Sequence, residues 1–307
     1  MSDWDAVIIG GGPAGLSAGL YLCRGNWRTL LLEKENVGGY IMNVEMIENY
    51  PGFAEGVAGA QLAMDMKNQA VKYGLQLKRA EVSRIQSLSG NMYVACVDGT
   101  TYTAKTIIVT AGSIHRKLGV PGEEEFRGSG VISCAFCDGG EFADQVVAVF
   151  GGGDAGITEA LYLTRIAAKV YLIEALPELT GTAILRDRVK NEPKIEVLCG
   201  KKAAAILGSS HVEAVQLLDV NNNTPETIKA DGVLVHIGLD PNSGFLEGVV
   251  QMDNTRQVKV NERMETNIPG IFAAGDIRSG SPRQVAGAVG DGAIAGIFAT
   301  RYLQQSM

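Results

Sequence analysis

Two glycine-rich segments constrain the fold of this 307-residue chain more than any other feature. The first, Gly10–Gly15, follows an apolar run typical of a buried parallel strand, and a helical pattern starts at Pro13. The next apolar run ends in Glu33. A strand, a glycine loop, a helix and a second strand ending in an acid form the βαβ unit of dinucleotide-binding folds. This segment therefore predicts a nucleotide site.

Each glycine of this loop has an expected task. Gly10 permits the tight turn, Gly12 lets the backbone approach a pyrophosphate, and Gly15 allows close packing of the helix. Glu33 is placed to bind a ribose hydroxyl group.

The same pattern returns in the middle of the chain. Gly151–Gly156 follows the strand pattern of residues 145–150, and the strand pattern of residues 169–174 ends in Glu174. The spacing from Gly151 to Glu174 equals that from Gly10 to Glu33. The residues expected at this second loop are Gly151, Gly153, Asp154, Gly156 and Glu174. The chain is therefore expected to be an α/β protein with two Rossmann-like, three-layer nucleotide-binding domains.

The second domain is expected to be inserted in the first. We place the first domain at residues 1–115 and 246–307, and the second at residues 116–245. Other expected elements are an amphipathic helix at 60–74, turns at Ser89-Gly90 and Asp98-Gly99, a helix from the second glycine loop to about Ala167, and strands near 195–198, 212–219 and 232–237.

The C-terminal segment carries a second group of candidate residues. The strand pattern of residues 268–274 leads to Gly275-Asp276, where the acid is either a helix N-cap or an acceptor for a polyol ligand. Both alternatives stay open. Arg283-Gln284 starts the last helix, whose many small residues permit close approach of another backbone or of a ligand.

A pair of cysteines precedes the second glycine loop. Cys134 and Cys137 are separated by two residues, the spacing of dithiols that open and close as a redox pair. Asp138 follows directly and can supply a proton to a leaving thiolate. A metal site needs about four ligands, whereas the other cysteines and the three histidines are scattered, so no metal is expected. A structural disulfide would be unusual in a chain without a secretory signal.

Composition excludes several classes of function. The net charge of −7 argues against nucleic acid and against an anionic membrane as partner. No apolar run has the roughly 18 residues of a membrane helix. Five cysteines, an odd number, fit a reducing cytoplasm.

Together these motifs resemble the low-molecular-weight thioredoxin reductases over essentially the whole chain. The matching segments are 10–15 with Glu33, Glu48–Gly52, Thr110–Gly112, Cys134–Gly139, Gly270–Asp276 and Arg283–Val285. The resemblance implies FAD in the first domain, with Asp276 on the ribityl chain and Gln284 near the flavin edge. The residues it places at the FAD site are Gly10, Gly12, Pro13, Ala14, Gly15, Glu33, Gly39, Asn49, Thr110, Ala111, Gly112, Gly275, Asp276, Arg283, Gln284 and Val285.

The resemblance also implies roles for the thiols. Cys137 is expected to face the flavin, Cys134 to attack the disulfide of a thioredoxin-like partner, and Asp138 to act as the acid. Family members are usually homodimers.

Three departures from the family pattern concern the electron donor. NADPH-using members carry a His-Arg-Arg cluster after the second strand, whereas this chain has the acidic and apolar segment Glu174–Leu179. Asp154-Ala-Gly replaces the usual Asp-Ser-Ala, and Phe136 replaces a commoner threonine. A 2′-phosphate needs cationic donors. We therefore expect NADPH to be a poor donor and favour a reduced ferredoxin, flavodoxin or deazaflavin, with NADH next.

Two other functions use the same motifs. A dithiol oxidase would pass electrons to oxygen, although such relatives usually lack the acid found here at Asp138. A non-enzymatic flavoprotein sensor would change partner when the disulfide closes. Turnover with thioredoxin distinguishes them from a reductase.

Overall fold

Two units make up the chain, and the second is inserted in the first. The computed structural model describes residues 3–88 and 91–305. The first unit runs to Ile114 and resumes at Asp240, and the second is His115–Leu239. The chain returns at Asp240 rather than at the expected residue 246, because β7 (Ser113–His115) pairs with β16 (Leu239–Pro241) and brings the outgoing and returning segments together. The expected turn at Ser89-Gly90 lies outside the described residues.

The first unit is built on a sheet whose central strands are parallel. The strand order is β3-β2-β1-β6-β5-β4, and β17 also pairs with β6. The strands are β1 (Trp4–Ile9), β2 (Thr29–Glu33), β3 (Gln76–Arg79), β4 (Val82–Leu88), β5 (Asn91–Cys96), β6 (Thr101–Val109) and β17 (Ile271–Ala273). Strands β1, β2, β3, β6 and β17 pair in parallel, whereas β4, β5 and β6 form an antiparallel meander.

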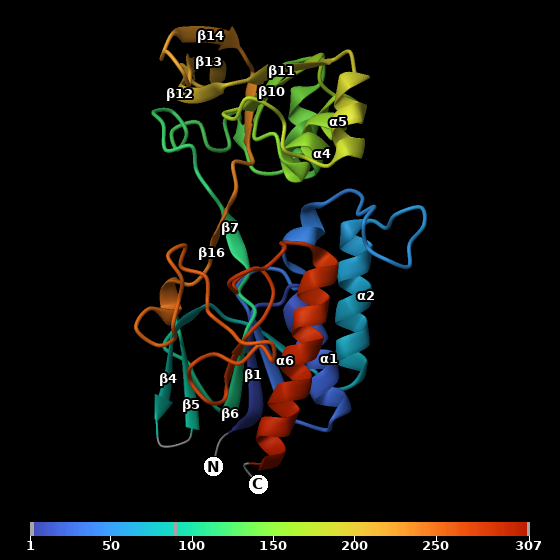
Figure 1. The fold of residues 1–307 in the computed structure, drawn as a ribbon, viewed down its shortest axis with the longest axis vertical. Helices are drawn as coiled ribbons and strands as arrows, with labels where there is room; N and C mark the ends of the chain where they lie inside the picture. The colour runs from blue at the N-terminus through green and yellow to red at the C-terminus, as the bar shows by residue number, and fades with distance from the viewer. Residues whose placement is uncertain (1–2, 89–90, 306–307) are drawn as a thin grey trace. The chain divides into compact units, whose positions relative to one another are not determined.

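Three helices cover one face of this sheet. They are α1 (Pro13–Arg24), α2 (Gly59–Lys72) and α6 (Val285–Gln305), and Figure 1 shows them side by side. Ile8 and Phe272 pack toward the helices with Leu16 and Leu303. The alternate residues of β1 pack on the opposite face, which is why the whole strand is apolar.

The second unit repeats the parallel sheet on a smaller scale. Its order is β11-β10-β9-β15-β8, from β8 (Val131–Ile132), β9 (Val146–Phe150), β10 (Lys169–Glu174), β11 (Ile195–Cys199) and β15 (Gly232–Val235). On one face lie α3 (Ala135–Asp138), α4 (Asp154–Leu163) and α5 (Ala183–Lys190). The other face packs on an antiparallel sheet of β12 (Lys201–Gly208), β13 (Val212–Asp219) and β14 (Pro225–Lys229). Both units are therefore Rossmann-like, as expected, and the second has three layers.

Some elements differ from the sequence expectation. Helix α4 ends at Leu163 rather than near Ala167, because the Thr164 hydroxyl donates to the carbonyl of Leu161 and the Arg165 N–H to that of Tyr162, which tightens the last turn. Elements α5, β12 and β14 were not expected. Among the described residues, no helix is long and apolar enough to cross a membrane.

Candidate functional site

Residues of the first motif meet at one edge of the first sheet. Strands β1, β2, β6 and β17 are parallel, so their carboxyl ends lie at the same edge. The segments that follow these ends carry the predicted site residues, which are Gly10–Gly15, Glu33, Thr110–Gly112 and Gly275–Asp276. This edge is where open α/β sheets bind their ligands.

The glycine loop is closed against the end of β6. Gly10 has φ +109°, and a Cβ at this position would lie 2.3 Å from the carbonyl oxygen of Thr110. The Thr110 hydroxyl donates to the carbonyls of Ile9 and Gly10, at 3.0 and 2.8 Å. Gly12 is the N-cap of α1 and Pro13 its first residue, so the loop presents a helix N-terminus.

Glu33 lies at the end of β2 and is bound to the loop itself. Its Oε2 accepts from the Gly11 N–H at 2.7 Å, and its Oε1 accepts from the Glu35 N–H at 2.9 Å. Both contacts fix the carboxylate beside the loop, in the position expected of a ribose acceptor.

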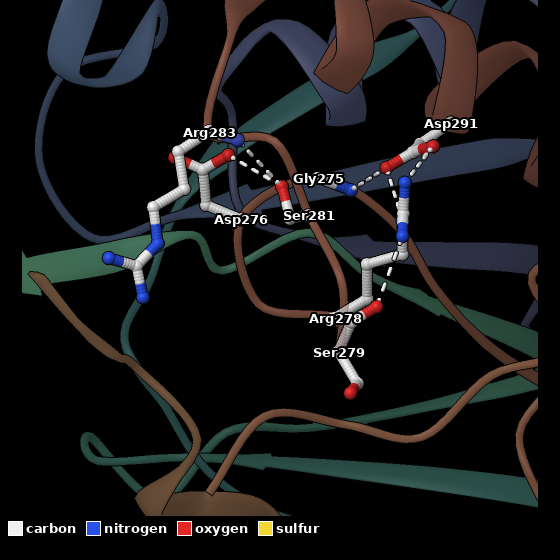
Figure 2. A network of polar contacts seen from close by, with 7 residues as sticks. All are labelled: Gly275, Asp276, Arg278, Ser279, Ser281, Arg283 and Asp291. Atoms are coloured by element: carbon white, nitrogen blue, oxygen red, sulfur yellow. Dashed lines mark hydrogen bonds and ion pairs between the residues drawn. The ribbon is translucent and has the colours of Figure 1, made fainter. Parts of the chain in front are cut away.

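Asp276 lies in a polar network after β17 (Figure 2). The Ser281 hydroxyl donates to Asp276 Oδ1 at 3.2 Å, and the Arg283 N–H donates to the Ser281 hydroxyl oxygen, also at 3.2 Å. Burial raises the pKa of Asp276, although the hydrogen bond from Ser281 acts the other way. No helix begins at this residue, since α6 starts at Val285. The N-cap alternative is therefore wrong, and a polar acceptor remains.

An ion pair between the partly buried Arg278 and the buried Asp291 fixes the loop around Asp276. Arg278 Nε and Nη2 donate to the two oxygens of Asp291, at 2.6 and 2.9 Å (Figure 2). Asp291 Oδ2 also accepts from the Gly275 N–H at 3.2 Å. The pair thus ties α6 to the backbone beside Asp276. Sequence reasoning missed it, because the two residues belong to different segments with no shared pattern.

Small residues of α6 serve its packing on α1. A Cβ at Gly292 would lie 2.1 Å from the carbonyl oxygen of Ala14, and one at Gly296 would lie 2.9 Å from that of Ala18. The sequence left two partners open for these small residues, another backbone or a ligand. At both positions the structure shows contact with another backbone.

Other predicted residues of the first site lie on connecting segments. Asn49 Nδ2 donates to Gln284 Oε1 at 3.0 Å, which joins two residues far apart in sequence. Gly39, with φ +66°, starts a 3₁₀ turn, and a Cβ there would lie 2.9 Å from the Cα of Gly12. Gly112 has φ +62° and accepts from the Asn242 N–H at 3.0 Å. Val285 packs on an apolar cluster around Ile41.

In the second unit, Cys134 and Cys137 form a disulfide. Cys134 is the N-cap of α3, and its sulfur accepts from the Cys137 N–H at 3.0 Å. Cys134 is buried, whereas Cys137 and Asp138 are exposed. Phe136 is also exposed and packs edge-on against Tyr162. The two sulfurs and the acid therefore lie on a single short turn.

The second glycine loop copies the first in detail. Gly151 has φ +114°, and a Cβ there would lie 2.2 Å from the carbonyl oxygen of His236. Gly10 stands in the same relation to the carbonyl oxygen of Thr110. Gly153 is the N-cap of α4, Asp154 is its first residue, and a Cβ at Gly156 would lie 1.9 Å from the carbonyl oxygen of Gly151. His236, which follows β15 and was missed by sequence reasoning, thus occupies the place of Thr110.

The residues of the first site fit FAD. Gly10 and Gly15 leave no room for side chains, and the helix N-terminus and the carboxylates of Glu33 and Asp276 are the donors and acceptors that a dinucleotide requires. When bound, FAD supplies a reversible two-electron redox centre.

A dinucleotide site in one unit and a dithiol–disulfide pair in the other define a nucleotide-dependent disulfide oxidoreductase. Residues 4–292 match the model of the pyridine nucleotide-disulphide oxidoreductases. The thioredoxin reductase of Treponema pallidum is 39% identical over 302 residues, which cover 98% of each chain. The chain belongs to the thioredoxin reductase family, and it is an FAD-dependent disulfide oxidoreductase.

Solved structures of this family have the same fold. The crystal structure of Lactococcus lactis thioredoxin reductase gives a TM-score of 0.96 at 36% identity and covers 99% of this chain and 100% of that one. A ferredoxin-flavin thioredoxin reductase from Clostridium acetobutylicum is 28% identical, with a TM-score of 0.54, over 98% of each chain.

Proposed function

We propose that this chain reduces the disulfide of a thioredoxin-like protein through FAD and the Cys134–Cys137 pair, with electrons from a donor other than NADPH. One observation carries the exclusion of NADPH. The carboxylate of Glu174 lies at the second glycine loop, where NADPH-using relatives need positive charge.

Glu174 is bound to its loop as Glu33 is bound to the first. Its Oε2 accepts from the Gly152 N–H at 2.6 Å, and its Oε1 accepts from the Leu176 N–H at 3.0 Å. A carboxylate held in this position accepts from free ribose hydroxyls but repels a 2′-phosphate. The second loop therefore suits a nucleotide without that phosphate better than one that carries it.

The segment after Glu174 supplies no compensating cation. Residues 175–182 read Ala-Leu-Pro-Glu-Leu-Thr-Gly-Thr, without Lys or Arg. The Thr180 and Gly181 N–H groups both donate to the Gly152 carbonyl at 2.9 Å. The Thr182 N–H donates to Asp154 Oδ1 at 2.7 Å. The segment is thus folded onto the loop by its own backbone.

The binding free energy lost with the missing cations is large enough to distinguish NADPH from the other donors. A hydrogen bond to a charged group contributes about 1.5–3 kcal/mol. Two missing arginine contacts therefore cost about 3–6 kcal/mol, or roughly 10²- to 10⁴-fold in affinity. Repulsion by Glu174 adds to this cost.

Among the remaining donors we place a non-nicotinamide reductant first. Leu179 crowds the second loop, because its Cδ2 lies 2.6 Å from where a Cβ of Gly152 would stand. Pro177 and the apolar residues beside it offer no polar partner to an adenosine. Similarity to a ferredoxin-flavin thioredoxin reductase supports a reduced ferredoxin, and a flavodoxin or a deazaflavin is the alternative low-potential donor. NADH is the second candidate, because Glu174 suits its free hydroxyl groups.

The thiols exchange disulfides in two steps. The Cys134 thiolate attacks the partner disulfide, a mixed disulfide forms, and the partner thiolate that leaves takes a proton from Asp138. Cys137 then attacks the sulfur of Cys134, so that the disulfide within the chain forms again and the second partner thiolate is released. The pair loses two electrons and the partner disulfide gains them. Since Cys134 is buried in the disulfide form, its attack requires the turn to open after reduction.

Two further expectations accompany this proposal. We propose that the enzyme works as a homodimer and in the cytoplasm, as the family resemblance implies.

Trapping the mixed disulfide tests the thiol roles and the partner. Cys137→Ser leaves Cys134 as the attacking thiol, so incubation with a thioredoxin disulfide should give a stable 1:1 adduct on a non-reducing gel. Cys134→Ser should give far less. Equal adduct from both variants contradicts the assigned roles, and adduct from neither contradicts a thioredoxin-like partner. Cys199→Ser, a cysteine remote in sequence from the pair, is the matched control.

A further inference from the structure

A buried carboxyl group lies against the redox turn. Glu159 is one of the buried residues of α4, whose Ile157 and Leu163 belong to the apolar cluster on this face of the sheet. Only 8% of the residue is exposed. Its Oε2 accepts from the Ala135 N–H at 2.6 Å, and Ala135 directly follows Cys134. Burying an ionised carboxyl group costs free energy unless hydrogen bonds or a counter-charge compensate for the lost water.

The backbone of the turn shows what this hydrogen bond does. Helix α3 begins at Ala135, whose N–H has no partner within the helix. The Cys137 N–H donates to the sulfur of Cys134, and the Asp138 N–H donates to the carbonyl of Cys134 at 3.1 Å. Atoms of the turn thus accept from Cys137 and Asp138, but not from Ala135. Glu159 supplies the acceptor for the Ala135 N–H.

Glu159 belongs to a row of contacts between α4 and the turn. Residues three and four positions along a helix lie on the same face. Tyr162 meets the ring of Phe136 at 5.8 Å between centroids. Leu163 Cδ2 lies 3.3 Å from where a Cβ of Gly139 would stand. The row contacts both ends of the turn, and Glu159 contacts it through a carboxylate.

We propose that Glu159 is a positioning residue that holds the Cys134–Cys137 turn on α4 and binds a proton when the disulfide is reduced. Reduction to the attacking thiolate of Cys134 and a thiol at Cys137 adds two electrons and one proton to the disulfide. The negative charge of this thiolate lies on the residue that precedes Ala135, whose N–H Glu159 binds, and it favours protonation of Glu159. One extra proton thus accompanies the electron pair.

The environment of Glu159 supports this coupling. Burial raises its pKa to about 7, and the hydrogen bond from Ala135 acts the other way. The carboxyl group therefore changes charge in the physiological range. The elements packed against α4 are α3, α5, β9 and β10. The titratable and charged groups on these elements, on α4 and on the adjoining turns are Cys134, Cys137, Asp138, Glu141, Asp154, Tyr162, Arg165, Lys169, Tyr171, Glu174, Arg186, Asp187, Arg188 and Lys190.

The substitution Glu159→Gln separates charge from position. Glutamine keeps an oxygen that accepts from Ala135 but carries no charge. In the FAD-loaded variant, we expect the equilibrium constant for reduction by dithiothreitol at pH 8.5 to rise on the order of tenfold. This corresponds to a midpoint potential about 30 mV higher. At pH 6 wild type and variant should agree, because Glu159 is then protonated and neutral. The thiol content of Cys134 and Cys137 is read by alkylation and mass spectrometry.

Two further variants complete the test. Glu159→Ala removes both charge and acceptor and should lower the melting temperature as well. Glu141→Gln makes the same chemical change at an exposed acid near the turn and should leave the potential unchanged at both pH values. The midpoint potential should fall more steeply between pH 7 and 8 in wild type than in Glu159→Gln. This readout does not depend on whether Glu159→Ala folds.

Three outcomes would overturn the proposal: equal potentials of wild type and Glu159→Gln at pH 8.5, a shift of the same size at pH 6, or an equal shift in Glu141→Gln. The inference rests on the redox role of Cys134 and Cys137 proposed above. Since the readout uses dithiothreitol and neither thioredoxin nor a nicotinamide, a wrong donor or partner would leave this result unchanged.

Discussion

Asp138 is the residue whose chemistry depends least on the rest of the fold. It is exposed, follows Cys137 directly, and its N–H is already bound to the carbonyl of Cys134. Its carboxyl group is therefore free to change partner without unfolding the turn. We expect Asp138→Asn to slow thioredoxin reduction by roughly 10²- to 10⁴-fold, the usual cost of losing a general acid.

The measurement is single-turnover reduction of thioredoxin by prereduced enzyme. Flavin content and the alkylation pattern of Cys134 and Cys137 should match wild type. Asp144→Asn, in a nearby exposed turn with φ +59°, is the control, because asparagine tolerates that conformation. A rate loss in Asp144→Asn as large as in Asp138→Asn would show that Asp138 does not act as the acid.

At the same scale, the sequence predicted some residues well and could not have found others. Gly10 and Glu33 belong to a local pattern with a fixed spacing, so their proximity follows from the fold. Glu159 has no such pattern: a single acid on an apolar helix face was the only available signal, and its partner is a backbone N–H on another element. The Arg278–Asp291 pair likewise depends on tertiary packing.

At the scale of elements, α6 and α1 pack so closely that a residue larger than glycine does not fit at their contact. Gly292 faces the backbone of Ala14, whereas within residues 3–88 and 91–305 no atom outside its own helix lies within 4 Å of a Cβ placed on Gly290. Gly292→Ala should destabilise the protein by about 1–3 kcal/mol, the usual cost of overpacking, and loosen the start of α1 at the FAD site. Gly290→Ala should stabilise it by about 0.5–1 kcal/mol, because alanine favours a helix.

Thermal unfolding of the two variants, with free flavin measured by fluorescence, provides the comparison. Opposite shifts of the melting temperature, with flavin loss only in Gly292→Ala, are expected. Shifts in the same direction would mean that the small residues of α6 are not there for its packing on α1.

The long or strongly patterned elements were predictable, and the short or charged ones were not. Helix α1 begins at Pro13 and ends at Arg24, as expected, because its apolar residues repeat regularly. Helix α5 has only eight residues, of which Arg186, Asp187, Arg188 and Lys190 are charged. Its helical period is therefore weak, and its position depends on packing through Val189.

At the scale of the whole molecule, the chain has the fold of the thioredoxin reductase family and carries two glycine loops of the same design. The duplication extends to atomic contacts, since Glu33 and Glu174 each accept from a glycine N–H and from a second backbone N–H. The sequence revealed this duplication through its spacing. It could not reveal that residues 180–182 fold back onto the second loop by backbone hydrogen bonds.

The most direct test of this account is the rate at which different donors reduce the bound flavin. The FAD-loaded enzyme is mixed anaerobically in a stopped-flow instrument with NADPH, NADH or a low-potential donor such as reduced ferredoxin, and the bleaching of the flavin is followed. We expect rapid reduction by the low-potential donor, slower reduction by NADH, and reduction by NADPH only at concentrations roughly 10²- to 10⁴-fold above those that saturate ordinary NADPH sites. Rapid bleaching that saturates at micromolar NADPH would contradict the account.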